Sequence, residues 1–282
     1  MSTPDFDPAR FKALERAGFN RIAARYADGA HLRSDLADAL LEAADLAPGQ
    51  HVLDLASGPC LLARDAAQRI APDGWVLATD IAEVMLAEGR RRATALSGCS
   101  ALAFAAADAE QLCVADASVD RVLAGLALFM FPHAERALAE MRRVLRPGGR
   151  LAMSVWGPRE AVPLIGCAQD CIARLLPAPR VPRPSVFRFG DTEQLTDALQ
   201  RAGFADVRVA PCRFACHFDS AADYWQAFLD LAGGAAESLA RLPDTTQQRL
   251  RAAVAEELAR YRDKKGGGFA LEALALVVSA RA

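Results

Sequence analysis

Lysine is scarce in this chain: only Lys12, Lys264 and Lys265 occur among 282 residues. None lies between residues 51 and 156, where the clearest nucleotide-site pattern is found. A nicotinamide oxidoreductase built on a catalytic tyrosine–lysine pair is therefore disfavoured. The formal net charge is only −2, which gives no general attraction for nucleic acid or for an anionic membrane. We expect neither as a partner.

Long apolar runs are also missing. No stretch approaches the roughly 20 residues that a membrane-spanning helix needs. The first residues lack the basic and apolar regions of a signal peptide, so we expect a cytoplasmic protein. With 52% hydrophobic residues, the chain can still bury a large core.

Cysteine is present, but its number and spacing do not indicate a disulfide framework. The seven cysteines are an odd number, and no C-x-x-C pattern occurs. Cys167 and Cys171 are spaced to share a helix face, and Cys212 and Cys216 a strand face. Burial as free thiols is the favoured interpretation of both pairs, and no metal site is predicted.

What the chain does contain is the layout of a nucleotide site. A buried strand carrying Asp54 is followed by the small residues Ala56, Ser57 and Gly58, then by an amphipathic helix and a second strand that ends at Asp80. The small residues allow close backbone approach to a ligand, and the helix start offers free N–H groups. A carboxylate at the end of the second strand can accept both hydroxyls of a ribose.

The same layout serves dinucleotides and S-adenosylmethionine. A dinucleotide pyrophosphate favours G-x-G-x-x-G, but Ala56 stands at the first glycine position, and Pro59, Cys60 and Leu61 follow Gly58 without a further glycine. S-adenosylmethionine has no phosphate, and its cationic groups suit a site that bears Asp54. The sequence therefore favours S-adenosylmethionine.

Further segments complete an alternating pattern of strands and helices. A third strand ending in Asp108 brings another carboxylate to the same sheet edge, where it can accept from an adenine amino group. We predict an α/β, Rossmann-like, seven-stranded, mostly parallel sheet with helices on both faces. After the strand at His51, the later strands are expected at 76–80, 103–108, 118–126, 150–156, 206–218 and 271–279.

Four ordered motifs identify a family. They are Val-Leu-Asp-Leu-Ala-Ser-Gly at 52–58, Thr-Asp-Ile-Ala-Glu-Val-Met-Leu at 79–86, Asp-Ala-Glu-Gln-Leu at 108–112 and Arg-Val-Leu-Arg-Pro-Gly-Gly-Arg-Leu at 143–151. Together they resemble the class I S-adenosylmethionine-dependent methyltransferases, in the small-molecule branch similar to the ubiquinone/menaquinone C-methyltransferases. The chain departs from that family at Ala56 and Cys60, where glycine is usual.

The resemblance implies a set of site residues. Tyr26 matches an arm tyrosine that approaches the methionine carboxylate, although ordinary packing is an equal alternative, and the residues after the fourth strand match the acceptor side. Expected cofactor contacts are Tyr26, Asp54, Ala56, Ser57, Gly58, Asp80, Ile81, Met85, Asp108, Ala109 and Leu126. Expected substrate contacts are Phe129 and Met130 after the fourth strand. The aromatic stripe of the predicted cap adds Tyr224, Trp225 and Phe228, independently of the resemblance, with packing as the alternative for these side chains.

We expect one methyltransferase-like domain with decorations. Residues 1–46 form a helical arm, and residues 47–157 the cofactor-binding core. Residues 158–218 hold a proline-rich lid loop and a continuation of the sheet, residues 219–268 a helical cap, and residues 269–282 the last strand. The sequence leaves the oligomeric state open, a homodimer included.

Methyl transfer is an in-line displacement that depends mainly on positioning. A general base helps for some acceptors, and His133, at a helix start beside the cofactor edge, is the best-placed candidate. His31 and His217 are weaker ones, and a surface histidine is the alternative for each. The expected function is methylation of a small apolar or aromatic metabolite at carbon or oxygen. The alternative is an S-adenosylmethionine-binding protein that uses its pocket for binding only or for another reaction, such as a cyclisation.

Overall fold

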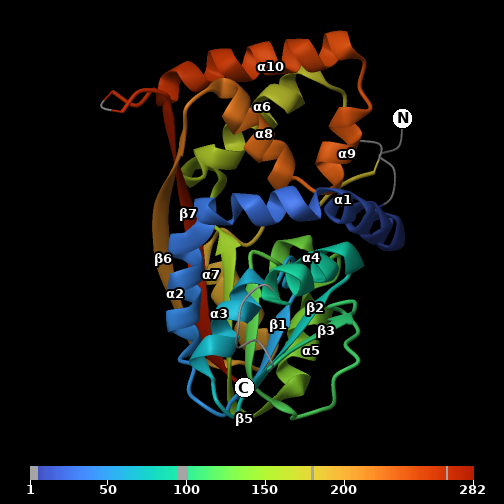
Figure 1. Ribbon diagram of the computed structural model, residues 1–282, viewed down its shortest axis with the longest axis vertical. Coiled ribbons are helices and arrows are strands. Elements are labelled where there is room, and N and C mark those ends of the chain that lie inside the picture. Colours follow the sequence, from blue (N-terminus) through green and yellow to red (C-terminus); the bar gives the residue numbers. More distant parts are fainter. Residues whose placement is uncertain (1–5, 95–100, 179–180, 265) are drawn as a thin grey trace.

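A seven-stranded sheet forms the centre of the computed structural model (Figure 1). The model describes residues 6–94, 101–178, 181–264 and 266–282. The strand order is β3-β2-β1-β4-β5-β7-β6, in which β7 runs antiparallel to both of its neighbours. The strands are β1 (His51–Leu55), β2 (Trp75–Asp80), β3 (Leu102–Ala106), β4 (Val119–Gly125), β5 (Leu145–Trp156), β6 (Ala205–Phe218) and β7 (Phe269–Arg281). The predicted fold class is confirmed.

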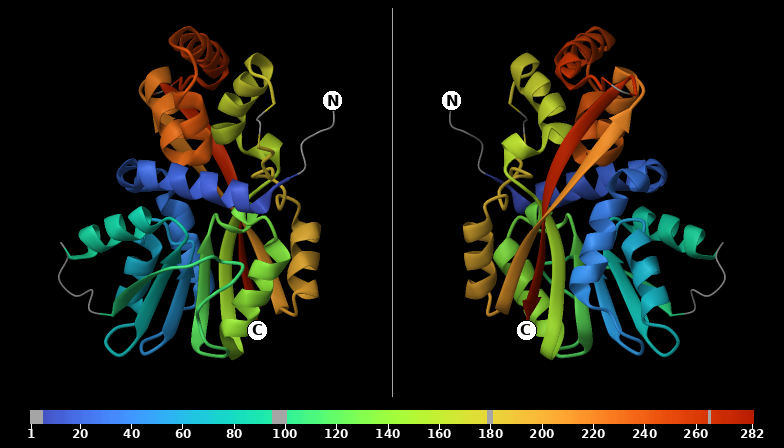
Figure 2. Two further views of the ribbon diagram at one scale, coloured as in Figure 1. Left: turned by 90° about the vertical axis from the view of Figure 1, so that its right-hand side faces the viewer. Right: turned by 90° about the vertical axis from the view of Figure 1, so that its left-hand side faces the viewer.

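Helices cover both faces of this sheet, as the two side views show (Figure 2). One face carries α2 (Ser34–Ala44), α3 (Leu61–Arg69) and α4 (Glu83–Thr94), and the other carries α5 (Ala134–Val144) and α7 (Thr192–Arg201). Successive strand residues point to opposite faces, so Val52 packs with α2 and α3 while Leu53 and Leu55 join the core on the other side. Burial on both faces explains the nearly continuous apolar composition of the strands.

The arm helix α1 (Pro8–Asp28) lies between the sheet and a helical cap (Figure 1). The cap contains α8 (Ala221–Leu231), α9 (Gly234–Ala240) and α10 (Asp244–Leu258), and α6 (Pro163–Leu175) packs against α8 and α10. The long strands β6 and β7 extend past the sheet and carry the cap (Figure 2). Among the described helices, none is long and apolar enough to cross a membrane.

Four short 3-10 helices join these elements: η1 (Gly29–Arg33), η2 (Leu128–Met130), η3 (Arg159–Ala161) and η4 (Ala259–Tyr261). Capping follows the sequence signals, because Asp7, Asp191 and Ser220 each accept a backbone N–H from the residue three positions later. The loop expected around the proline cluster after residue 176 is non-helical where it is described, and Pro179 lies outside the described residues.

Some boundaries differ from the predictions. β3 ends at Ala106, so Asp108 lies two residues beyond the strand, although still at the same sheet edge. β5 begins at Leu145 rather than at Arg150. The Pro-Gly-Gly segment at 147–149 does not separate helix from strand. Instead, Leu145 pairs with Val119 on β4, and the backbone of Gly149 accepts a hydrogen bond from Ala282, which extends the strand backwards.

Candidate functional site

The turn after β1 is held in an uncommon backbone conformation. Ala56, Gly58 and Cys60 have φ angles of 52°, 55° and 57°, in the left-handed region that non-glycine residues rarely adopt. The turn is fixed to the end of β2, because the Gly58 N–H donates to Asp80 Oδ2 at 2.9 Å and the Ser57 N–H donates to the Thr79 carbonyl at 2.9 Å. Such local strain is typical of ligand sites.

Cys60 replaces the family's usual glycine without entering the site. Its side chain is buried and packs on Gly89 of α4, where an added Cβ would lie 2.6 Å from the Cys60 sulfur. Burial raises the pKa of Cys60 to about 12, so its thiol stays protonated. Gly89 therefore provides the space that Cys60 takes up.

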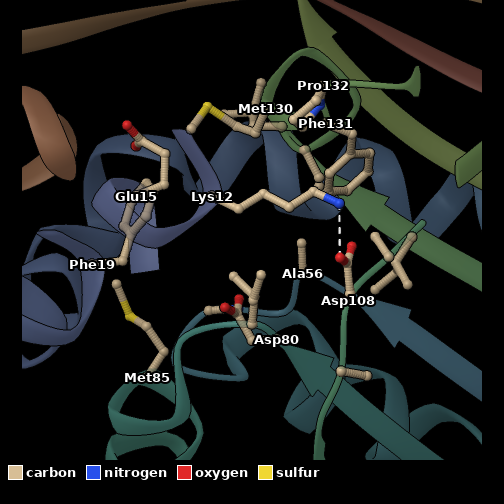
Figure 3. Close-up of a pocket in the computed structure, with 18 of the residues that line it drawn as sticks. Lys12, Glu15, Phe19, Ala56, Asp80, Met85, Asp108, Met130, Phe131 and Pro132 are labelled. Atoms are coloured by element: carbon tan, nitrogen blue, oxygen red, sulfur yellow. Dashed lines mark hydrogen bonds and ion pairs between the residues drawn. The ribbon is translucent and has the colours of Figure 1, made fainter. Parts of the chain in front are cut away.

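The first cavity lies at the carboxyl ends of β1, β2 and β4, beneath the arm, and measures about 110 Å³ (Figure 3). Nine of the predicted cofactor residues line it: Tyr26, Ala56, Gly58, Asp80, Ile81, Met85, Asp108, Ala109 and Leu126. Asp54 and Ser57 do not line it. Alignment of the strand ends thus brings together side chains that are far apart in the sequence.

Asp80 has both carboxylate oxygens facing backbone donors. Oδ2 accepts from Gly58, and Oδ1 accepts from the Ala82 N–H at 2.8 Å. Burial raises the pKa of Asp80, although these hydrogen bonds act in the opposite direction. Because each oxygen has a second lone pair, Asp80 can still accept hydroxyl groups from a ligand in the cavity.

Asp54 lies behind the site rather than in it. It shares a strand face with Val52, is 1% exposed, and its Oδ2 has no hydrogen-bond partner among the described residues. Burial raises the pKa of Asp54 to about 8, so this carboxyl group is mostly protonated at neutral pH. The sequence argument that gave Asp54 a negative charge fails here, because it took no account of desolvation.

The arm contributes residues that the sequence reasoning missed. Phe11, Lys12, Glu15 and Phe19 of α1 line the first cavity (Figure 3). Lys12 Nζ lies 2.7 Å from Asp108 Oδ2 and 2.7 Å from Glu110 Oε2. Burial opposes the charge on Lys12, but hydrogen bonds to the two carboxylates outweigh it and raise its pKa. The isolation of Lys12 as the single lysine of the first 263 residues was the available signal.

A second cavity of about 660 Å³ lies between the arm, the cap and the loop after α6. Of the predicted substrate residues, Phe129, Met130, Tyr224 and Phe228 line it, whereas Trp225 does not. Both cavities share one set of wall residues: Phe11, Glu15, Phe19, Tyr26, Leu126 and Met130. The two spaces are therefore neighbours, with the arm between them.

Tyr224 also has a structural role. Its hydroxyl donates to the Leu164 carbonyl at 3.0 Å and accepts from the Ala168 N–H at 3.1 Å, both on α6. Tyr224 is 1% exposed, and burial raises its pKa. The phenol thus joins α8 to α6 and presents only part of its ring to the cavity.

None of the four histidines lines either cavity. The His133 side chain is 35% exposed, with Nδ1 3.7 Å from Glu135 on the outer side of α5. Its backbone N–H, by contrast, donates to Glu110 at 2.9 Å. His31 Nδ1 lies 3.0 Å from the Asp28 carbonyl oxygen, and His217 Nδ1 lies 3.9 Å from Asp263.

Over the described ranges, no group of three histidine, cysteine, aspartate or glutamate side chains is arranged to hold a metal ion. Cys167, Cys171 and Cys216 are buried free thiols, and Cys212 is partly buried. Burial raises the pKa of Cys167 to about 12, which makes this thiol unreactive.

Comparison with known proteins agrees with this geometry. Residues 52–149 match the model of a family described as a methyltransferase domain. The chain is 42% identical over 160 residues to a ubiquinone/menaquinone biosynthesis C-methyltransferase of Bordetella avium, a match that covers 54% of this chain and 59% of that relative. It is 31% identical over 230 residues to the protein of the same description from Cupriavidus taiwanensis, covering 73% of this chain and 93% of the relative.

Solved structures share the fold at lower identity. The phosphoethanolamine N-methyltransferase 2 of Haemonchus contortus, in complex with S-adenosyl-L-methionine, superposes with a TM-score of 0.54 at 17% identity. The match covers 88% of this chain and 52% of that protein. This similarity supports the fold and nothing more specific.

Proposed function

Since this chain belongs to the class I S-adenosylmethionine-dependent methyltransferases, we propose that it methylates a small apolar or aromatic molecule held in the second cavity. The observation that carries this proposal is the shared wall of the two cavities. A donor in the first cavity and an acceptor in the second would meet at Tyr26, Leu126 and Met130. The second cavity falls within the roughly 300–1,000 Å³ typical of small-molecule sites.

The residues of the first cavity suit the donor chemically. In our proposal, Asp80 accepts the ribose hydroxyls, Asp108 accepts the adenine amino group, and the left-handed turn at Ala56 and Gly58 lets the backbone approach the methionine part. Tyr26 is placed to contact the methionine carboxylate. The bound donor supplies the electrophilic methyl group. At about 110 Å³ this cavity is smaller than a typical ligand pocket, so the arm must shift for entry.

We assign the rate acceleration mainly to alignment of the acceptor atom with the methyl group. A histidine base is not favoured, because His133 faces neither cavity. Leu126 supports the alignment. Its backbone has a φ of 51°, and its N–H donates to both the carbonyl and the hydroxyl of Ser154 at 3.0 Å, which fixes the shared wall. The name of the relatives favours carbon as the methylated atom.

The test is methyl transfer from donor labelled in its methyl group. The protein is incubated with fractions of a small-molecule cell extract, and label is followed into products that partition into organic solvent. We expect enzyme-dependent label in an apolar fraction, and about tenfold less with Asp80→Ala at a limiting donor concentration. If S-adenosylhomocysteine binds in calorimetry but no fraction accepts label, the alternative of a binding protein or a non-methylating enzyme replaces this proposal.

A further inference from the structure

Positive charge dominates the polar part of the second cavity. Most of its lining is apolar, but three arginines, Arg33, Arg159 and Arg183, face it together with one carboxylate, Glu15. Charged groups in an apolar cavity are costly unless they are paired, so the partner of each arginine decides what the cavity can bind.

Arg159 is satisfied by the protein itself. Its guanidinium donates to Gln169 Oε1 at 2.9 Å, forms an ion pair with Asp170, and lies 5.4 Å from the ring centroid of Phe187. The positive charge of Arg159 is therefore compensated by a carboxylate on α6.

Arg183 is satisfied as well. It forms an ion pair with Glu15, whose side chain is only 7% exposed, and its guanidinium lies 5.9 Å from the ring centroid of Phe11. Burial lowers the pKa of Arg183. The charges of Arg183 and Glu15 therefore neutralise one another where the arm meets the loop after α6.

Arg33 is different. It ends η1, is partly buried, and its guanidinium carbon lies 4.5 Å from the ring centroid of Tyr26. Within the described parts of the chain, Arg33 makes no ion pair with a carboxylate; its guanidinium contacts this ring, and its charge also acts on the thiol of Cys216. An arginine over an aromatic face keeps its edge N–H groups free to donate to an anion.

We propose that the second cavity takes an amphipathic acceptor, with an apolar or aromatic body in the cavity and one anionic group, such as a carboxylate, on Arg33. This inference rests on the proposed function, because it treats the cavity as the acceptor site. In this proposal, the guanidinium of Arg33 binds the anionic group through paired hydrogen bonds. Its position on Tyr26, which lines both cavities, sets the anion near the shared wall and so orients the acceptor.

The experiment compares two fluorescent probes with the same aromatic body. Anilinonaphthalene sulfonate is anionic, and N-phenyl-naphthylamine is neutral. Both are titrated into the full chain, with and without saturating S-adenosylhomocysteine. For Arg33→Gln we expect the dissociation constant of the sulfonate to rise about tenfold, since a charge-assisted hydrogen bond is lost, while that of the neutral probe changes less than about twofold. Arg33→Lys should lie between the two.

The matched control is Arg213→Gln. Arg213 is exposed on β6 and lines neither cavity, so this variant removes the same charge without touching the proposed site. We expect both probes to bind it as they bind the wild type. Ala227→Phe adds a ring to the wall of the second cavity. This variant should weaken binding of both probes, which would show that they bind in that cavity.

Three results would overturn the proposal. One is equal sulfonate affinity in Arg33→Gln and wild type, and another is an equal loss for both probes, which would make Arg33 a structural support for Tyr26. The third is unchanged binding of both probes to Ala227→Phe. Calorimetry with S-adenosylhomocysteine reports on the first cavity alone. If S-adenosylhomocysteine fails to bind while the probes behave as expected, the proposed methyl donor is wrong, but the proposed anion site at Arg33 is still supported.

Discussion

Replacing Lys12 with methionine should tighten binding of S-adenosylhomocysteine. In the structure, Asp108 Oδ2 accepts from Lys12 and Oδ1 accepts from the Glu110 N–H, so one lone pair on each oxygen of the carboxylate that we assign to the adenine amino group is taken. The Lys12 ammonium and the amino group of a ligand would therefore compete for Asp108 Oδ2. Methionine has nearly the same length and apolar stem, but it cannot form the ion pair.

The size of the effect follows from the burial of this ion pair. Side chains of Lys12 and Asp108 are 22% and 36% exposed, so solvent screens their contact, and breaking it costs about 1 kcal/mol. Removing that cost should lower the dissociation constant about fivefold. Because the same contact joins α1 to the sheet edge, the ligand-free variant should also unfold at a lower temperature.

Calorimetric titration with S-adenosylhomocysteine tests this prediction, because its neutral sulfur avoids the separate effect of removing a positive charge near a sulfonium. The control is Arg16→Met on the same helix, which breaks the exposed ion pair of Arg16 with Glu83; Arg16 does not line the first cavity. Arg16→Met should bind as the wild type does. Weaker binding by Lys12→Met would show that Lys12 holds the arm closed over the ligand rather than competing with it.

Three further outcomes are expected. Asp80→Ala should weaken binding of S-adenosylhomocysteine at least tenfold in calorimetry, because the Gly58 turn loses its hydrogen bond to the carboxylate and the ribose hydroxyls lose their acceptor. Unchanged affinity would show that Asp80 is not part of the site. The His133→Ala variant should methylate at the wild-type rate at saturating donor, and a clearly lower rate would support His133 as a general base. Asp54 releases its proton more readily when unfolded, where its pKa is near 3.8, than when folded, where it is about 8. Unfolding is therefore favoured increasingly as pH rises from about 4 to about 8, and urea titrations should show that Asp54→Asn removes this slope; a slope that persists would show that another group takes up the proton.

The features that the sequence predicted are those set by local patterns. The turn at 56–58 and the carboxylates Asp80 and Asp108 are each encoded within a few residues. These features were therefore within reach of motif and periodicity arguments.

The features that the sequence did not predict depend on contacts between distant segments. Lys12 meets Asp108 across 96 positions, and no spacing rule relates them. Tyr224 was expected to contact the substrate, with packing as the alternative; it lines the second cavity, while its hydroxyl is held by α6, a helix that the sequence alone does not place beside α8. Protonation of Asp54 depends on how closely α3 covers β1, which only the packed structure decides.

The two cavities differ in charge in a way that fits the chemistry we propose. Carboxylates of Asp80 and Asp108 face the first cavity, where the donor carries a positive sulfonium, whereas the unpaired guanidinium of Arg33 faces the second. An anionic acceptor would be drawn toward Arg33 and toward the sulfonium beyond the shared wall, so attraction would help to align the reacting atoms. Methyl transfer converts the sulfonium into a neutral thioether and removes that attraction. The charges that bring donor and acceptor together would thus favour separation of the products, and binding of the anionic probe should be tighter with S-adenosylmethionine present than with S-adenosylhomocysteine.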